Sequence, residues 1–127
     1  MLASGQPEYM RKAMKQLEHI HLTPGHEQAL TEVLHRLYDQ FHVVRVILYG
    51  SVARGEADEE SDIDLLILTA EPLSRPARHD ITDLVFEVNL RYGTNFRTLV
   101  LDQHTWEVGA VAGLPLKEAI LQDGIPL

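Results

Sequence analysis

The sequence of 127 residues contains no cysteine. Thiol catalysis, zinc–thiolate sites and disulfide frameworks are therefore excluded, and a reducing compartment, the cytoplasm, is expected. Long apolar runs are also missing, because no segment offers the roughly 18 consecutive apolar residues that cross a membrane. The N-terminus lacks a basic region followed by an apolar one, so we expect neither a secretory signal nor a membrane anchor.

Basic residues are scarce as well, since 11 Lys and Arg stand against 19 Asp and Glu, which gives a formal net charge of -8. A chain with this charge repels nucleic acid and anionic membranes, so we expect neither as a partner. Aromatic residues make up only 6% of the chain. We expect Trp106, Phe86 and Phe96 to lie in the core rather than to stack on bases.

The remaining composition, 45% hydrophobic and 24% charged residues, is that of an ordinary globular protein. A chain of this length buries enough apolar surface to fold without a metal or a disulfide. We therefore expect residues 1–127 to form a single domain. Its oligomeric state stays open, and a homo-oligomer is compatible with the composition.

A helical hairpin is predicted at the N-terminus, over about residues 7–41. Apolar residues recur at three- and four-residue steps between Pro7 and His19, and again after Pro24. Thr23 and Pro24 are typical of an N-cap and a first helical residue, so they mark the start of the second helix.

Two strands are predicted after the hairpin, Val43–Tyr49 and Asp62–Thr69. Both are almost continuously apolar, as expected of strands that are covered on both faces. Gly50 and Ser51 end the first strand abruptly. The polar stretch from Gly55 to Ser61 is predicted to be a loop.

The second half of the chain continues to alternate between helix and strand. Apolar residues at helical spacing from Ile81 to Leu90 predict a helix that Gly93 ends. Asn95–Leu101 has strand character, a short helix contains Trp106, and Pro115 begins a last helix. Helices that alternate with single strands predict an α+β fold, a small sheet flanked by helices.

Acidic residues are concentrated near the start of the second strand, where six lie between Glu56 and Asp64 without a basic residue among them. Asp62 and Asp64 differ from the others, because residues two apart on a strand point to the same face, about 6.6 Å apart. Charges at the head of a buried strand are costly unless they are paired or bind a metal. Two converging carboxylates favour Mg²⁺ that is bound together with phosphates. The simplest interpretation of the other four acids is a solvated loop: Glu56, Asp58, Glu59 and Glu60.

A complementary phosphate site is indicated at the end of the first strand. Gly50 has no Cβ, so backbone N–H groups there can approach phosphate oxygens closely. If a helical turn begins at Ser51, its N-terminus favours the same anion. Arg54 lies one turn further on, and two interpretations stay open: a phosphate ligand, or an ion-pair partner of the neighbouring acids.

These residues resemble a known signature. Gly50-Ser51, ten intervening residues and then Asp62-Ile63-Asp64 are similar to the motif of the DNA polymerase beta nucleotidyltransferase superfamily. The longer strings Leu48–Gly55 and Ser61–Leu65 resemble its minimal nucleotidyltransferase (MNT) branch. The specific part of the resemblance spans Val43–Thr69.

The resemblance implies a polymerase-beta-type fold with a small mixed sheet. It also implies an enzyme that binds an NTP, ATP in first place, with Mg²⁺ or Mn²⁺ and transfers a nucleoside monophosphate. Asp62 and Asp64 would be the catalytic, metal-binding residues. Gly50, Ser51 and Arg54 are the nucleotide-binding candidates. Members of the branch often serve as antitoxins to HEPN-like toxins and some attach AMP to the toxin, so a protein acceptor and a HEPN-like partner are implied.

One departure from the family pattern concerns a third carboxylate, which active members of the superfamily commonly carry on the next core strand. The corresponding stretch, Asn95–Leu101, contains no acid, and neither Asp102 nor Glu87 matches the family position. Arg97 on this strand is expected near the cleft, where its charge favours holding nucleotide. The main hypothesis is therefore slow nucleotidyl transfer, and the alternative is a catalytically impaired module that binds nucleotide or a partner. A third hypothesis is an unrelated domain with an accidental motif.

Overall fold

The computed structural model describes Leu17, Ile20 and residues 22–56 and 61–127. The first helix of the predicted hairpin, from Pro7 to His19, lies outside these residues except for Leu17, so the hairpin itself stays a prediction. The second predicted helix is present.

One four-stranded mixed sheet organises the described part of the chain, in the strand order β3-β2-β1-β4. Strands β2 and β3 are parallel, whereas β1 is antiparallel to both of its neighbours, β2 and β4. The predicted class, an α+β fold with a small mixed sheet flanked by helices, is confirmed. The elements follow one another as α2 (Pro24–Gln40), β1 (Val43–Tyr49), β2 (Ile63–Thr69), α3 (Arg75–Tyr92), β3 (Phe96–Asp102), α4 (Gln103–Val108), α5 (Pro115–Asp123) and β4 (Ile125–Pro126).

Capping residues set the bounds of the two long helices. The Thr23 hydroxyl accepts the His26 N–H at 3.1 Å and starts α2, and Ser74 does the same for α3 through the N–H of Ala77. Gly93 ends α3 in the left-handed conformation, with φ of 67°. The sequence predicts the start of α2 and the end of α3, but α3 begins at Arg75, before the predicted apolar stripe that starts at Ile81.

β2 begins one residue later than predicted and ends at Thr69 as predicted, whereas the whole of β3 lies one residue later than predicted. β2 begins at Ile63, and β3 runs over Phe96–Asp102. Asp102 therefore belongs to the strand, and its carboxylate also caps α4 by accepting the Thr105 N–H at 3.0 Å. The shift adds one acid, Asp102, to the C-terminal end of β3.

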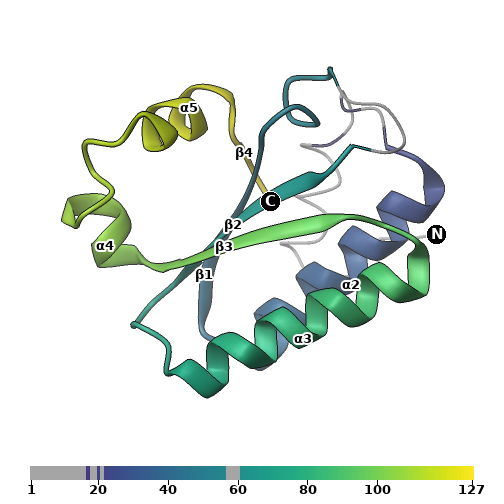
Figure 1. The fold of residues 1–127 in the computed structure, drawn as a ribbon, viewed down its shortest axis with the longest axis horizontal. Coiled ribbons are helices and arrows are strands. Elements are labelled where there is room, and N and C mark those ends of the chain that lie inside the picture. The colour runs from purple at the N-terminus through teal and green to yellow at the C-terminus, as the bar shows by residue number, and fades with distance from the viewer. Residues whose placement is uncertain (1–16, 18–19, 21, 57–60) are drawn as a thin grey trace, which may run out of the picture.

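The sheet separates two apolar clusters, and Figure 1 shows it between the α2–α3 pair and the α4–α5 pair. Leu65 and Ile67 of β2 pack in the cluster that α2 and α3 build, whereas Leu66 and Leu68 pack with α4 and α5. Alternate residues of a strand point to opposite faces, so Asp64 shares the α4–α5 side with Leu66.

Helix α3 carries two large apolar side chains on its outer side. Phe86 is 62% exposed and Leu90 is 70% exposed, so the predicted burial of Phe86 is wrong. The buried stripe between Ile81 and Val88 already fills the interface of α3 with the sheet, and Phe86 lies on the opposite side of the helix. Phe96 and Trp106 are buried as predicted. None of the helices in the described residues is long and apolar enough to cross a membrane.

Candidate active site

The chain turns sharply after Tyr49, at the end of β1. Gly50 has φ of 83°, a left-handed conformation that residues with a side chain rarely adopt. One helical turn follows, in which the Arg54 N–H donates to the Gly50 carbonyl at 3.2 Å and the Glu56 N–H to the Ser51 carbonyl at 3.0 Å. The first N–H groups of such a turn, beginning with that of Ser51, have no partner within it. Anion binding by these groups stays a prediction.

Asp62 and Asp64 lie together at the head of β2. The Asp64 side chain is only 14% exposed, whereas that of Asp62 is 41% exposed. A Cβ on Gly50 would lie 2.5 Å from Oδ2 of Asp64, far closer than atoms pack. The Asp64 carboxylate thus rests directly against Gly50, and a Cβ at this position would displace it.

Arg97 of β3 joins the two carboxylates. The register of the parallel strands pairs Arg97 with Asp64, and the guanidinium Nε donates to Asp64 Oδ1 at 2.9 Å. Its Nη1 lies 3.4 Å from Asp62 Oδ2. The hydrogen bond to Asp64 and the charges of both carboxylates raise the pKa of Arg97 further above its ordinary value. The guanidinium is permanently charged, as arginine is in proteins.

Tyr49 is a neighbour of Asp64 that the sequence prediction did not single out. It is the direct partner of Asp64 across the antiparallel β1–β2 pair. Burial raises the pKa of Tyr49 above its ordinary value of 10.0, the Asp64 charge adds to this shift, and Arg97 opposes it. The phenol is therefore neutral and able to donate a hydrogen bond. Its position directly before Gly50 was the signal in the sequence.

Arg54 forms an ion pair with Glu56, with 3.1 Å between Nε and Oε2. Of the two interpretations of Arg54, phosphate ligand or ion-pair partner, the structure shows the ion pair. Both side chains are exposed, and such surface pairs contribute little to stability, so Arg54 stays accessible to an anion. Its role as a nucleotide ligand remains a prediction.

Asp102 does not reach the carboxylates of β2. It pairs with Thr69 at the opposite end of the β2–β3 ladder, five residues from Arg97, which is roughly 16 Å along the strand. Its two carboxylate oxygens accept the N–H and the hydroxyl of Thr105. The residue of β3 that is directly beside Asp64 is therefore a guanidinium and not a third acid.

Glu87 does not reach them either, because it belongs to an ionic network between α2 and α3. Its carboxylate lies 3.2 Å from Arg36 and 2.8 Å from Arg91. Arg91 and Tyr92 also donate to Glu32 of α2, at 2.6 and 3.0 Å. The network lies on the α2–α3 side of the sheet, opposite to Asp64.

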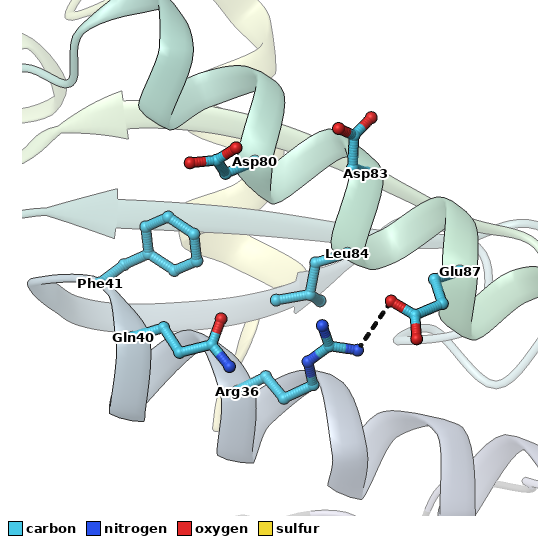
Figure 2. A pocket seen from close by; sticks show the side chains of 7 residues that line it. All are labelled: Arg36, Gln40, Phe41, Asp80, Asp83, Leu84 and Glu87. Carbon is cyan, nitrogen blue, oxygen red and sulfur yellow. Dashed lines mark hydrogen bonds and ion pairs between the residues drawn. The ribbon is translucent and has the colours of Figure 1, made fainter.

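A cavity of about 350 Å³ adjoins this network between α2 and α3. Figure 2 shows Arg36 reaching from α2 toward Glu87 of α3 along its lining. Since the sheet lies between this cavity and the carboxylates of β2, the two are separate features. The lining consists of Arg36, Gln40, Phe41, Asp80, Asp83, Leu84 and Glu87.

Comparison with known proteins shows the family to which the chain belongs. The sequence profile of the nucleotidyltransferase domain matches residues 27–122. The chain belongs to this family. The resemblance to minimal nucleotidyltransferases that the sequence predicts is confirmed.

Two relatives illustrate the range of the family. MJ1305 of Methanocaldococcus jannaschii, provisionally named a protein adenylyltransferase, is 38% identical over 77 residues, which cover 58% of this chain and 52% of that protein. The bifunctional uridylyltransferase/uridylyl-removing enzyme of Vibrio cholerae is 30% identical over 111 residues, which cover 81% of this chain and 13% of the enzyme. The chain thus spans about half the length of the archaeal relative.

Solved structures share the fold. A toxin–antitoxin complex with AMP-PNP has a TM-score of 0.54 at 18% identity, and the match covers 75% of this chain and 68% of the other. A provisionally named nucleotidyltransferase from Sulfolobus solfataricus has a TM-score of 0.51 at 17% identity, with 97% and 89% covered. At these identities the likeness shows the fold alone.

The carboxylates fit the divalent metal that the family implies. Asp62 and Asp64 offer oxygen ligands on one face, and Gly50 leaves the space that the Asp64 carboxylate occupies. Mg²⁺ typically binds one or two protein carboxylates and takes its other ligands from water and substrate phosphates. Within the described residues no group of three or more His, Asp or Glu is placed to hold a metal ion. A two-carboxylate site that shares its metal with a nucleotide is the arrangement these residues allow.

Proposed function

We propose that this chain binds an NTP, ATP in first place, as its Mg²⁺ complex and transfers the nucleoside monophosphate to a protein acceptor. The main supporting observation is the placement of Asp62 and Asp64 beside Gly50 in a member of the nucleotidyltransferase family. The names of the archaeal relatives, which denote protein adenylyltransferases, support AMP and a protein acceptor. AMP-PNP in a toxin–antitoxin structure of the same fold supports an adenine nucleotide.

Each candidate residue has a distinct role in this proposal. Asp62 and Asp64 hold the metal ion, which when bound neutralises phosphate charge and orients the triphosphate. Gly50 leaves room for the Asp64 carboxylate. The N–H groups that begin at Ser51 bind phosphate oxygens, and the exposed guanidinium of Arg54 adds a cation for the same phosphates.

The transfer joins the oxygen of an acceptor hydroxyl to the α-phosphorus and breaks the bond from that phosphorus to the pyrophosphate leaving group. The hydroxyl proton needs an acceptor, and the β3 residue beside Asp64 is Arg97, which cannot accept a proton. The loss of one general base typically slows a reaction roughly 10²- to 10⁴-fold. We therefore propose slow transfer to a cognate protein rather than rapid turnover.

The partner that we propose is a HEPN-like toxin, for which this chain would be the antitoxin. Toxin–antitoxin complexes among the structures of the same fold support a protein partner. The net charge of -8 disfavours a nucleic-acid acceptor. The reaction requires NTP, so the cytoplasm is the proposed compartment.

Arg97 favours a second candidate function. A guanidinium bound to both carboxylates suits a module that holds nucleotide or a partner protein and catalyses no transfer. In this alternative the nucleotide stabilises the fold without being consumed.

Incubation with each α-labelled NTP, Mg²⁺ and the protein that co-purifies with the chain distinguishes the two functions. Transfer predicts label on protein, with ATP most effective, and no label for a double variant, D62N/D64N, or without metal. The binding module predicts a metal-dependent rise of Tm with ATP and no label on protein. Absence of both label and a Tm rise would contradict both functions.

A further inference from the structure

Arg97 is the one cationic side chain that the described residues show bound to Asp62 and Asp64. We propose that it is a resident counter-ion that a divalent metal has to displace, so that the metal enters only together with the phosphates of a nucleotide. This inference rests on the proposed role of Asp62 and Asp64 as metal ligands. It adds to the site a residue, Arg97, that disfavours the free metal ion and admits the metal together with a nucleotide.

The contacts of Arg97 place it in competition with a metal ion. Its Nε donates to Oδ1 of Asp64 at 2.9 Å, and its Nη1 lies 3.4 Å from Asp62, so it binds the same carboxylates that would bind the metal. A free divalent ion would have to break these charge-assisted contacts and accept a fixed positive charge a few ångströms away. Metal alone is therefore expected to bind weakly.

The surroundings of Arg97 allow it to change partners. Its side chain is 64% exposed and stands at the start of β3, so it is not enclosed by packing. A triphosphate brings enough negative charge for a metal ion and a guanidinium together, and arginine binds phosphate with a planar pair of donors. On binding of Mg-NTP, Arg97 would move from Asp64 to the phosphates and leave Asp62 and Asp64 to hold the metal.

The proposal predicts that the binding of metal and the binding of nucleotide are positively coupled. Metal and nucleotide each improve the binding of the other, because either one alone leaves the guanidinium or the carboxylates without a full set of partners. Removal of Arg97 should strengthen the binding of metal alone and weaken the binding of metal–nucleotide. A residue that only stabilises the fold would not shift the two affinities in opposite directions.

Mn²⁺ is the probe for the test, since its paramagnetic signal separates free from bound ion and it prefers the same oxygen ligands as Mg²⁺. R97Q should bind Mn²⁺ alone on the order of tenfold more tightly than the wild type and Mn-AMP-PNP several-fold more weakly. R97K, which keeps the charge, should stay close to the wild type for Mn²⁺ alone. R75Q removes an equal charge at the start of α3, beyond the opposite end of β2, and should change neither affinity.

Two results distinguish a failure of the inference about Arg97 from a failure of the proposed function. If R97Q binds Mn²⁺ no more tightly than the wild type while D64N abolishes Mn-AMP-PNP binding, the inference about Arg97 is wrong and the proposed metal site stands. If the double variant D64N/R97Q keeps the Mn²⁺ affinity of R97Q, the carboxylates are not the metal ligands and the proposed function fails with the inference. A circular dichroism melt of each variant verifies that it is folded.

Discussion

Arg97 and Asp64 are direct neighbours across the parallel β2–β3 pair, and the guanidinium Nε of Arg97 donates to Asp64 Oδ1 at 2.9 Å. The register therefore places a positively charged side chain, that of Arg97, beside Asp64, the more buried of the two carboxylates. A third acid at this position would help to bind metal and accept a proton, whereas arginine neutralises charge and binds phosphate. For this reason we propose nucleotide binding with slow transfer rather than rapid catalysis.

Gly50 gives the first prediction. Gly50→Ala places a Cβ 2.5 Å from Asp64 Oδ2 in a left-handed backbone conformation. We expect the free energy of unfolding to fall by roughly 1–2 kcal/mol from the backbone conformation. We also expect the affinity for Mg-ATP to fall at least tenfold, because the displaced Asp64 can no longer hold the metal. Chemical unfolding and calorimetry measure the two effects.

Gly55→Ala is the matched control for this prediction. Gly55 lies in the same turn with φ of 73°, and a Cβ on it meets nothing within 4 Å. The control should lose similar stability and keep its affinity for Mg-ATP. Equal affinities for the two variants would show that the Gly50–Asp64 contact has no part in nucleotide binding.

Asp102 gives the second prediction. Asp102→Ala removes the cap of α4 and should lower Tm by a few degrees, because the Thr105 N–H and hydroxyl lose their acceptor. Affinity for Mg-ATP should not change, since Asp102 lies at the far end of β3 from Arg97. A loss of affinity as large as that of D64N would place Asp102 in the site after all.

Much of the fold could be predicted from local signals. Thr23 and Gly93 mark helix ends through their own hydrogen bonds and backbone angles, and the apolar runs mark the strands, whereas the start of α3 at Ser74 was missed. The exposure of Phe86 could not be predicted in this way, because it depends on which side of α3 meets the sheet. The order and direction of the strands likewise depend on contacts between distant segments.

One part of the candidate site could be predicted from the sequence, and the contacts between distant segments could not. The two-residue spacing of Asp62 and Asp64 on a strand predicts their common face without any tertiary contact. The bond from Arg97 depends on the register of parallel strands 33 residues apart, which no local pattern specifies. The contact between Gly50 and Asp64 has the same origin, so the sequence predicts a glycine for phosphate approach and misses its contact with the carboxylate.

Glu32 gives the third prediction, on the dependence of stability on pH. Burial by itself raises the pKa of Glu32, but hydrogen bonds from Tyr92 and Arg91 and the Arg91 charge outweigh it and hold the pKa below its ordinary value of 4.5. Because the pKa is lower in the folded state, the stabilisation is present above that value and is lost as pH falls through the folded pKa.

Urea unfolding of Glu32→Gln and the wild type tests this dependence. At neutral pH the variant should be less stable by no more than about 1 kcal/mol, since the ion pairs are partly exposed. The difference should shrink as the pH falls below the ordinary pKa of glutamate. Glu71→Gln, an exposed change in the connector before α3, should show no such trend, and a constant difference for Glu32→Gln would contradict the assignment.

The metal-dependent binding of ATP is the fourth prediction and tests the proposed site most directly. Calorimetric titration of the wild type with ATP should give binding in Mg²⁺ and little or none in a chelator, because the carboxylates and phosphates repel one another without the metal. D62N/D64N should lose at least tenfold in affinity in Mg²⁺ while it stays folded. Equal ATP affinity with and without Mg²⁺, or an unchanged affinity in D62N/D64N, would contradict the assignment of these carboxylates to the metal and nucleotide.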